Sequence, residues 1–242
     1  MLNGRFLFLQ HHLGLGDHLL CNGLYRHLAK QHGRIYLVAK THNSEALKNM
    51  LCDVPNIKIL PVELSRADPV QKRMGAFAKR LNLPSLGIGI YGKDFFLPGE
   101  AIRFDEQFYR QAGVPFEERW ASFRFCRDEK REMDLMGSFG FAPKKYIFIH
   151  EDASRGFLID RSRITSRLPV VEARKSPGVG FFDYAGIIEN AAEVHCIESS
   201  FAALIEGMGL SMPKRAHRYA RPEAFNDFRH EFTYKSDWEI LI

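Results

Sequence analysis

The feature that most constrains the fold is a regular alternation of short apolar segments with longer segments of helical apolar spacing. Predicted strands cover residues 5–10, 34–39, 56–62, 86–92, 145–150, 167–173, 193–198 and 214–220. Predicted helices cover residues 17–31, 43–53, 70–82, 104–112, 127–139, 182–192 and 199–209. Strands separated by helices in this way form βαβ units, whose strands run parallel. The sequence therefore predicts an α/β protein with parallel sheets.

The alternation is interrupted once, between residues 93 and 118, where two prolines and two glycines break the rhythm. A second series of strands and helices follows, and 242 residues are enough for two small domains. We therefore expect two similar α/β domains, residues 1–115 and 116–242. The tail after residue 220 is expected to pack back on the second domain, because it carries the aromatic residues Phe225, Phe228, Phe232, Tyr234 and Trp238.

The net charge of the chain points to an anionic partner. The formal charge is +5 and the pI is near 9.0, values that suit nucleic acid, a phosphorylated ligand or a membrane surface. Nucleic acid is the least favoured of the three, because the basic residues are dispersed and no known recognition module is present.

The cysteines and the apolar runs indicate the compartment. Cys21, Cys52, Cys126 and Cys196 lie far apart with no Cys-x-x-Cys pair, which argues against a zinc site or a disulfide framework and is typical of a reducing cytosol. We expect them to be small buried hydrophobic residues. The N-terminal apolar stretch is interrupted by polar residues, and no run reaches the ~20 apolar residues of a membrane span. A soluble cytoplasmic protein is predicted.

The loop Gly14-Leu15-Gly16-Asp17 is the first candidate site, because open parallel sheets bind ligands at the carboxyl ends of their strands. Its glycines allow the backbone to approach a ligand, and the N–H groups of a helix start attract anions. Asp17 has two explanations that do not exclude each other, an N-cap of the helix or an acid that faces a cleft. The loop is no dinucleotide fingerprint, because Leu19 occupies the third glycine position.

The second and third candidate sites follow strands of the second domain. In "HEDASRG", residues 150–156, Arg155 could hold a phosphate through two hydrogen bonds and Ser154 could donate another. In "HCIESSF", residues 195–201, Ser199 or Ser200 begins a helix whose N–H groups could hold a pyrophosphate. The simpler explanations are a solvated polar loop for the second site and a plain helix cap for the third.

Several other functions are poorly supported by the motifs. The chain contains no His-Glu-x-x-His, no Asp-x-Asp, no Gly-x-Ser-x-Gly and no complete Walker-type Gly-x-x-x-x-Gly-Lys-Ser/Thr sequence, because Asp94 follows the Gly-Lys pair of residues 87–93. The absence of these patterns argues against metal-dependent, serine-hydrolase and P-loop chemistry.

Three segments together resemble the heptosyltransferase-like glycosyltransferase family 9 group of the GT-B superfamily. "HLGLGDHLLCNGLYRHLAKQHGRIYLVAK" is similar to the first strand, Gly-Asp turn and helix of that group. "YIFIHEDASRG" is similar to the opening strand of its donor-binding half, and "AGIIENAAEVHCIESSFAALIEGMGL" to the later segment in which an acidic-Ser/Thr turn starts a helix. The resemblance implies two Rossmann-like domains that face each other across a cleft, the second of which holds a nucleotide-diphosphate sugar.

The resemblance also implies roles for individual residues. Asp17 would be the general base that takes a proton from the acceptor hydroxyl. Arg155, with Ser154, and the Ser199/Ser200 helix start would stabilise the departing diphosphate without a metal or other cofactor.

Other site residues are implied with less specific roles. Glu198 would bind donor hydroxyls, although the family usually has Asp at this position. The acceptor and phosphate contacts would come from the first loop, through Gly14, Gly16, His12 and His18, with His11 beside them.

The function expected from the resemblance is an inverting transfer of a hexosyl or heptosyl group to a glycan or glycolipid acceptor, as in lipopolysaccharide synthesis. The positive charge also suits contact with a membrane surface. Two alternatives stay open: a catalytically silent nucleotide-sugar-binding protein, and a sugar-nucleotide epimerase or hydrolase of the same fold.

Overall fold

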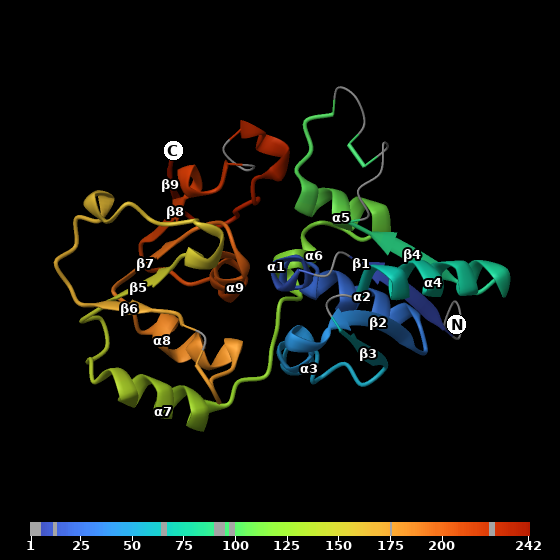
Figure 1. Ribbon diagram of the computed structural model, residues 1–242, viewed down its shortest axis with the longest axis horizontal. Coiled ribbons are helices and arrows are strands. Elements are labelled where there is room, and N and C mark those ends of the chain that lie inside the picture. The colour runs from blue at the N-terminus through green and yellow to red at the C-terminus, as the bar shows by residue number, and fades with distance from the viewer. Residues whose placement is uncertain are drawn as a thin grey trace. The chain divides into compact units, whose positions relative to one another are not determined.

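The computed structural model describes residues 6–11, 14–63, 67–89, 95–96, 100–174, 176–222 and 226–242. It divides into two compact units, residues 1–126 and 127–242. Each unit contains one sheet, and every strand pair in both sheets is parallel. The predicted α/β class with two parallel sheets is confirmed (Figure 1).

Unit 1 has a four-stranded sheet in the order β3-β2-β1-β4. Its strands are β1 (Leu7–His11), β2 (Ile35–Lys40), β3 (Ile57–Val62) and β4 (Ser85–Ile88). Its α-helices are α1 (Leu15–Leu20), α2 (Asn22–Gln31), α3 (Ser44–Met50), α4 (Ala67–Arg80), α5 (Phe104–Ala112) and α6 (Glu118–Ala121). The central strands bury most of their side chains, which is why they read as apolar runs, whereas Phe8 of β1 and Tyr36 of β2 are only partly buried.

The single helix expected over residues 17–31 is in fact two helices. They are separated at Cys21, whose backbone has φ −90° and ψ 9°. The hydroxyl of Tyr109, on α5, accepts a hydrogen bond from Leu24 N at 3.2 Å and donates one to Leu20 O at 2.9 Å. These two backbone groups would bond to each other in a continuous helix, so the inserted hydroxyl accounts for the break.

Unit 2 has a five-stranded sheet in the order β6-β5-β7-β8-β9. Its strands are β5 (Ile147–His150), β6 (Val170–Glu172), β7 (Glu193–Cys196), β8 (Lys214–His217) and β9 (Glu239–Leu241). Its α-helices are α7 (Glu129–Phe139), α8 (Ala185–Glu189) and α9 (Ser200–Met208).

The connection from β5 to β6 contains two short 3₁₀ turns, residues 153–155 and 161–163, in place of an α-helix. It still covers the sheet, because its Ile159 packs in a buried cluster with Ile147, Ile149 and Ile197. Unit 2 therefore has a core on this side of its sheet without an α-helix in the connection.

The tail packs on unit 2. Glu206 of α9 accepts hydrogen bonds from Lys235 N at 2.7 Å and from Trp238 Nε1 at 2.8 Å, and Phe232 is buried. Strand β9, which was not predicted, then pairs with β8. Phe225 lies outside the described residues.

The division between the units falls after Cys126 and not after residue 115. Helix α6 packs on α2, where a Cβ at Gly23 would lie 1.8 Å from the carbonyl oxygen of Glu118. Glycine is therefore required at this contact, and residues 116–126 belong to unit 1.

The expectation of four reduced, buried cysteines is wrong for two of them. Cys52 and Cys126 are exposed and form a disulfide across 74 residues of sequence, whereas Cys21 and Cys196 are free and buried. Cys126 N donates to Asn49 O at 2.9 Å, which holds its segment against the end of α3. Sequence spacing could not show this pairing, because the packing of α3 creates it.

Among the described residues, no helix has the length and apolar character needed to cross a membrane.

Candidate functional site

Each sheet has one point at which the strand order reverses. In unit 1, β2 lies on one side of β1 and β4 on the other; in unit 2, β6 and β7 flank β5 in the same way. Crevices at the carboxyl ends of strands at such switch points are the usual ligand sites of open α/β sheets. The first candidate loop follows β1 and the second follows β5, so both lie at these positions.

Asp17 does not cap its helix, contrary to one of its two predicted explanations. The N-cap of α1 is Gly14, with φ −73° and ψ 140°, and Asp17 stands inside the first turn. Neither Gly14 nor Gly16 has a positive φ, so backbone conformation does not explain the glycines. Asp17 is half-buried.

His18 points into the protein interior. Its side chain is fully buried, and its Nδ1 lies 2.8 Å from the Tyr25 hydroxyl. Burial raises the pKa of the neighbouring Cys21 thiol well above its usual value, so this cysteine stays protonated. The side chains of His18 and Cys21 are both buried in the interior of unit 1. His18 is therefore not placed to contact a ligand. His12 lies outside the described residues.

Ser154 and Arg155 both bind the same acid of their own loop. Asp152 accepts from Ser154 Oγ at 2.6 Å and from Arg155 Nε at 2.7 Å, and these bonds hold the pKa of Asp152 below its usual value despite partial burial. The loop closes through the Asp152–Phe157 bridge and a positive φ of 73° at Gly156. Arg155 is 54% exposed, and its guanidinium carbon lies 4.8 Å from the centroid of the Phe157 ring.

Ser199 occupies the N-cap position of α9, as predicted, but its hydroxyl does not cap the helix. The Ser199 hydroxyl lies 2.9 Å from His150 Nδ1 at the end of β5. This bond brings the second and third candidate loops together at the switch point. The first-turn N–H groups of α9, which begin with half-buried Ser200, are left without a side-chain cap.

His150 is a site residue that the sequence did not single out. Burial lowers its pKa to about 4, so its ring is neutral near pH 7. It also packs on Phe201, with ring centroids 4.5 Å apart. The only signal in the sequence was its place as the last residue of a predicted strand.

Glu198 is buried and turned towards the tail. Its Oε1 accepts from Arg218 Nη2 at 2.9 Å, and Arg218 also pairs with Glu231. Burial raises the pKa of Glu198, and the Arg218 charge opposes this rise. Contact between this carboxylate and a donor sugar would require Glu198 to leave Arg218.

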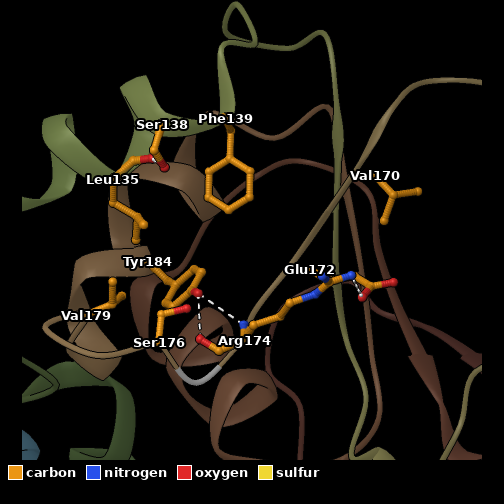
Figure 2. A pocket seen from close by; sticks show the side chains of 9 residues that line it. All are labelled: Leu135, Ser138, Phe139, Val170, Glu172, Arg174, Ser176, Val179 and Tyr184. Carbon is orange, nitrogen blue, oxygen red and sulfur yellow. Dashed lines mark hydrogen bonds and ion pairs between the residues drawn. The ribbon is translucent and has the colours of Figure 1, made fainter.

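Unit 2 also has an open pocket of about 680 Å³ beside the edge strand β6. Figure 2 shows Leu135, Ser138 and Phe139 of α7 on one side of it, and Val170 and Glu172 of β6 on the other. The remaining lining residues are Arg174, Ser176, Val179 and Tyr184. None of the predicted site residues lines this pocket.

The charged and hydroxyl groups of this pocket bind mainly one another. Arg174 Nη2 donates to Glu172 at 2.9 Å, and the Tyr184 hydroxyl binds the backbone of Arg174. The pocket is therefore less suited to a diphosphate than the loops at the switch point.

Comparison with known proteins places the fold. No protein-family profile matches the sequence, and curated protein sequences give no match. Among solved structures, the glycosyl transferase family 9 protein of Veillonella parvula DSM 2008 has a TM-score of 0.53 at 12% identity, over 89% of this chain and 80% of that one. ADP-heptose LPS heptosyltransferase II of E. coli has a TM-score of 0.54 at 11% identity, over 88% and 84%.

A third similar structure is the larger TibC, an iron-containing dodecameric glycosyltransferase of enterotoxigenic E. coli H10407. Its TM-score is 0.54 at 12% identity, and the match covers 97% of this chain but 62% of TibC. The three structures show that the chain shares the fold of these glycosyltransferases.

Proposed function

We propose that this protein is a metal-independent, inverting glycosyltransferase that uses a nucleotide-diphosphate sugar. The observation that supports this proposal most is the position of the candidate loops. They occupy the switch points of two parallel sheets, in a fold shared with family 9 glycosyltransferases.

In unit 2, the donor diphosphate would bind at the switch point between β5 and β7. The uncapped first turn of α9 offers N–H groups, and exposed Arg155 offers a positive charge. The neutral His150 ring fixes the Ser199 hydroxyl at this helix start. These groups would stabilise the charge that develops on the leaving diphosphate.

In unit 1, Asp17 would act as the general base. Its carboxylate takes the proton of an acceptor hydroxyl, and the hydroxyl oxygen forms a bond to the anomeric carbon. The bond from that carbon to the diphosphate oxygen breaks, and the diphosphate leaves with the electron pair. A single displacement of this kind inverts the anomeric centre. The group transferred would be hexosyl or heptosyl, and the acceptor a glycan or glycolipid.

Thermal shift with a panel of nucleoside diphosphates and nucleotide sugars tests donor binding. We expect at least one of them to raise the melting temperature, and Arg155→Ala to weaken that binding. Arg167→Ala is the matched control, because Arg167 is another exposed arginine of unit 2 with no described partner. No stabilisation by any compound of the panel would contradict the proposal.

Turnover of the bound donor then separates the three functions. Transfer that requires an acceptor supports the glycosyltransferase. Turnover without acceptor would favour the epimerase or hydrolase, and binding without turnover would favour a silent binding protein.

A further inference from the structure

Unit 1 carries an exposed apolar patch, here called the α4 patch and defined as Phe6, Phe8, Tyr36, Phe77 and Leu81. The rings of Phe8 and Tyr36 stack with centroids 5.4 Å apart, and Phe77 meets Phe8 edge-on at 6.5 Å. Phe6 contacts Tyr36 at 6.3 Å. Phe77, Leu81 and Phe6 remain 53%, 51% and 38% exposed, so the cluster is covered only in part.

Two cations flank this patch on α4. Arg73, Phe77 and Arg80 follow the i, i+4, i+7 spacing that places residues on one face of a helix, whereas Lys72 and Lys79 lie about 100° further round the helix from the two arginines. These four basic side chains are exposed, and none has a hydrogen-bond or ion-pair partner among the described residues. Lys58, which pairs with Tyr36 across β2 and β3, adds a further exposed cation.

Few acidic residues accompany these cations in the sequence. Asp68 precedes Lys72 by one helical turn, and no acidic residue occurs between Asp68 and Asp94. The combination of projecting aromatic and aliphatic side chains with a row of cations is typical of helices that lie on anionic lipid, where the apolar tips enter the interface and the cations meet phosphate groups.

A second copy of the chain fits the patch less well. In a two-fold symmetric contact the same surface meets itself, so Arg73 and Arg80 would face the same two cations of the second copy. Charge complementarity instead favours an extended anionic surface.

We propose that the α4 patch docks unit 1 on the surface of an anionic lipid bilayer. Phe6 precedes β1 and Asp17 follows it, so the patch and the first candidate loop lie at opposite ends of this strand. Docking therefore leaves the Asp17 loop uncovered. The inference does not depend on the proposed transferase activity, because it rests only on exposure and charge.

Co-sedimentation of the full chain with vesicles tests the proposal. We expect binding to vesicles of phosphatidylcholine mixed with phosphatidylglycerol, weakened by salt, and little binding to phosphatidylcholine alone. Phe77→Ala/Leu81→Ala should weaken binding about tenfold or more, as expected from loss of apolar burial. Leu158→Ala is the matched control, because Leu158 is 52% exposed but belongs to unit 2; it should bind like wild type.

Phe77 also packs on Phe8, so the apolar variant removes a contact within unit 1 as well as exposed apolar area. A charge variant tests the proposal without changing this packing. Arg73→Glu/Arg80→Glu changes only exposed residues and should abolish most binding, since each cation near the surface contributes about fivefold in affinity. Equal binding to both vesicle types, or wild-type binding by this variant, would overturn the proposal. Self-association that is lost in Phe77→Ala/Leu81→Ala would overturn it too, in favour of a second copy.

Discussion

Tyr109 and Leu24 are joined by a hydrogen bond that replaces a helical one. The Tyr109 hydroxyl accepts from Leu24 N at 3.2 Å and, through its own proton, binds Leu20 O at 2.9 Å. Because this hydroxyl separates α1 from α2, it sets the direction of the short helix that carries Asp17. A residue of α5 thus positions the first candidate loop.

Tyr109→Phe should lower the free energy of unfolding by about 1 kcal/mol, the typical contribution of a buried hydrogen bond. It should also change amide exchange at Leu24, because that N–H must find another acceptor. Tyr146→Phe is the control, since its buried hydroxyl donates to Ile187 O at 2.7 Å in unit 2. Both variants should lose stability. If Asp17 is the general base, only Tyr109→Phe should also lose turnover, and its donor affinity should stay unchanged. Equal turnover in the two variants would contradict a positioning role.

Reduction of the Cys52–Cys126 disulfide should destabilise the protein. Removal of a cross-link that spans 74 residues increases the entropy of the unfolded chain, and losses of about 2–4 kcal/mol are typical. Urea denaturation with and without reductant measures the difference, and Cys126→Ser should reproduce it. Thiol titration of the unreduced, denatured protein should detect only Cys21 and Cys196; detection of all four cysteines would refute the bond.

Arg218→Met should destabilise unit 2 by about 3–5 kcal/mol, because it leaves the buried carboxylate of Glu198 without its cation. The double variant Glu198→Gln/Arg218→Met should recover much of this loss. Arg229→Met, which breaks the more exposed pair with Asp227, should cost less than about 1 kcal/mol. If the two single variants melt alike, Glu198 and Arg218 do not form the pair described here.

The stability of unit 2 should fall as the pH is lowered below neutrality. Burial and the neighbouring His195 lower the pKa of His217 to about 3, whereas an unfolded histidine titrates near 6.5. Between these values the unfolded chain binds the extra proton, so stability is complete above about pH 6.5 and declines as the pH falls towards 3.

His217→Gln removes this titration and retains a side chain that can form hydrogen bonds. Denaturant unfolding from pH 7 to pH 5 should therefore give a flatter dependence for the variant than for wild type, by up to about 1.4 kcal/mol per pH unit. The ring of His217 also bonds to the Tyr219 hydroxyl and to His195, so the comparison concerns the slope and not the absolute stability. Parallel slopes would show that His217 does not titrate in this range.

The fold was predictable because it depends on local patterns. The buried strands of both sheets are apolar runs, and the helices between them have the spacing that parallel sheets require. Strand β9 escaped prediction because it is only three residues long and its first side chain, Glu239, is exposed.

The sequence predicted which loops form the candidate site, but not the contacts that their side chains make. Ser199 was correctly placed at a helix start, but its partner His150 lies 49 residues away in the sequence and meets it only through the pairing of β5 with β7. The prediction that Asp17 caps its helix was wrong, because the helix begins two residues earlier, at Leu15. A contact between distant segments determines the Ser199–His150 pair, and no local pattern encodes it.

The direct test of the proposed chemistry is donor turnover by Asp17→Asn, measured with the donor and acceptor that support transfer by wild type. Asn preserves the shape of the side chain and removes the proton-accepting charge. The matched control is Glu45→Gln, which neutralises an acid in the first turn of α3 in the same unit. We predict that Asp17→Asn keeps its melting temperature and donor affinity but loses transfer by at least the 10²-fold typical of a general base, whereas Glu45→Gln transfers like wild type. Transfer by Asp17→Asn at the wild-type rate would contradict the account.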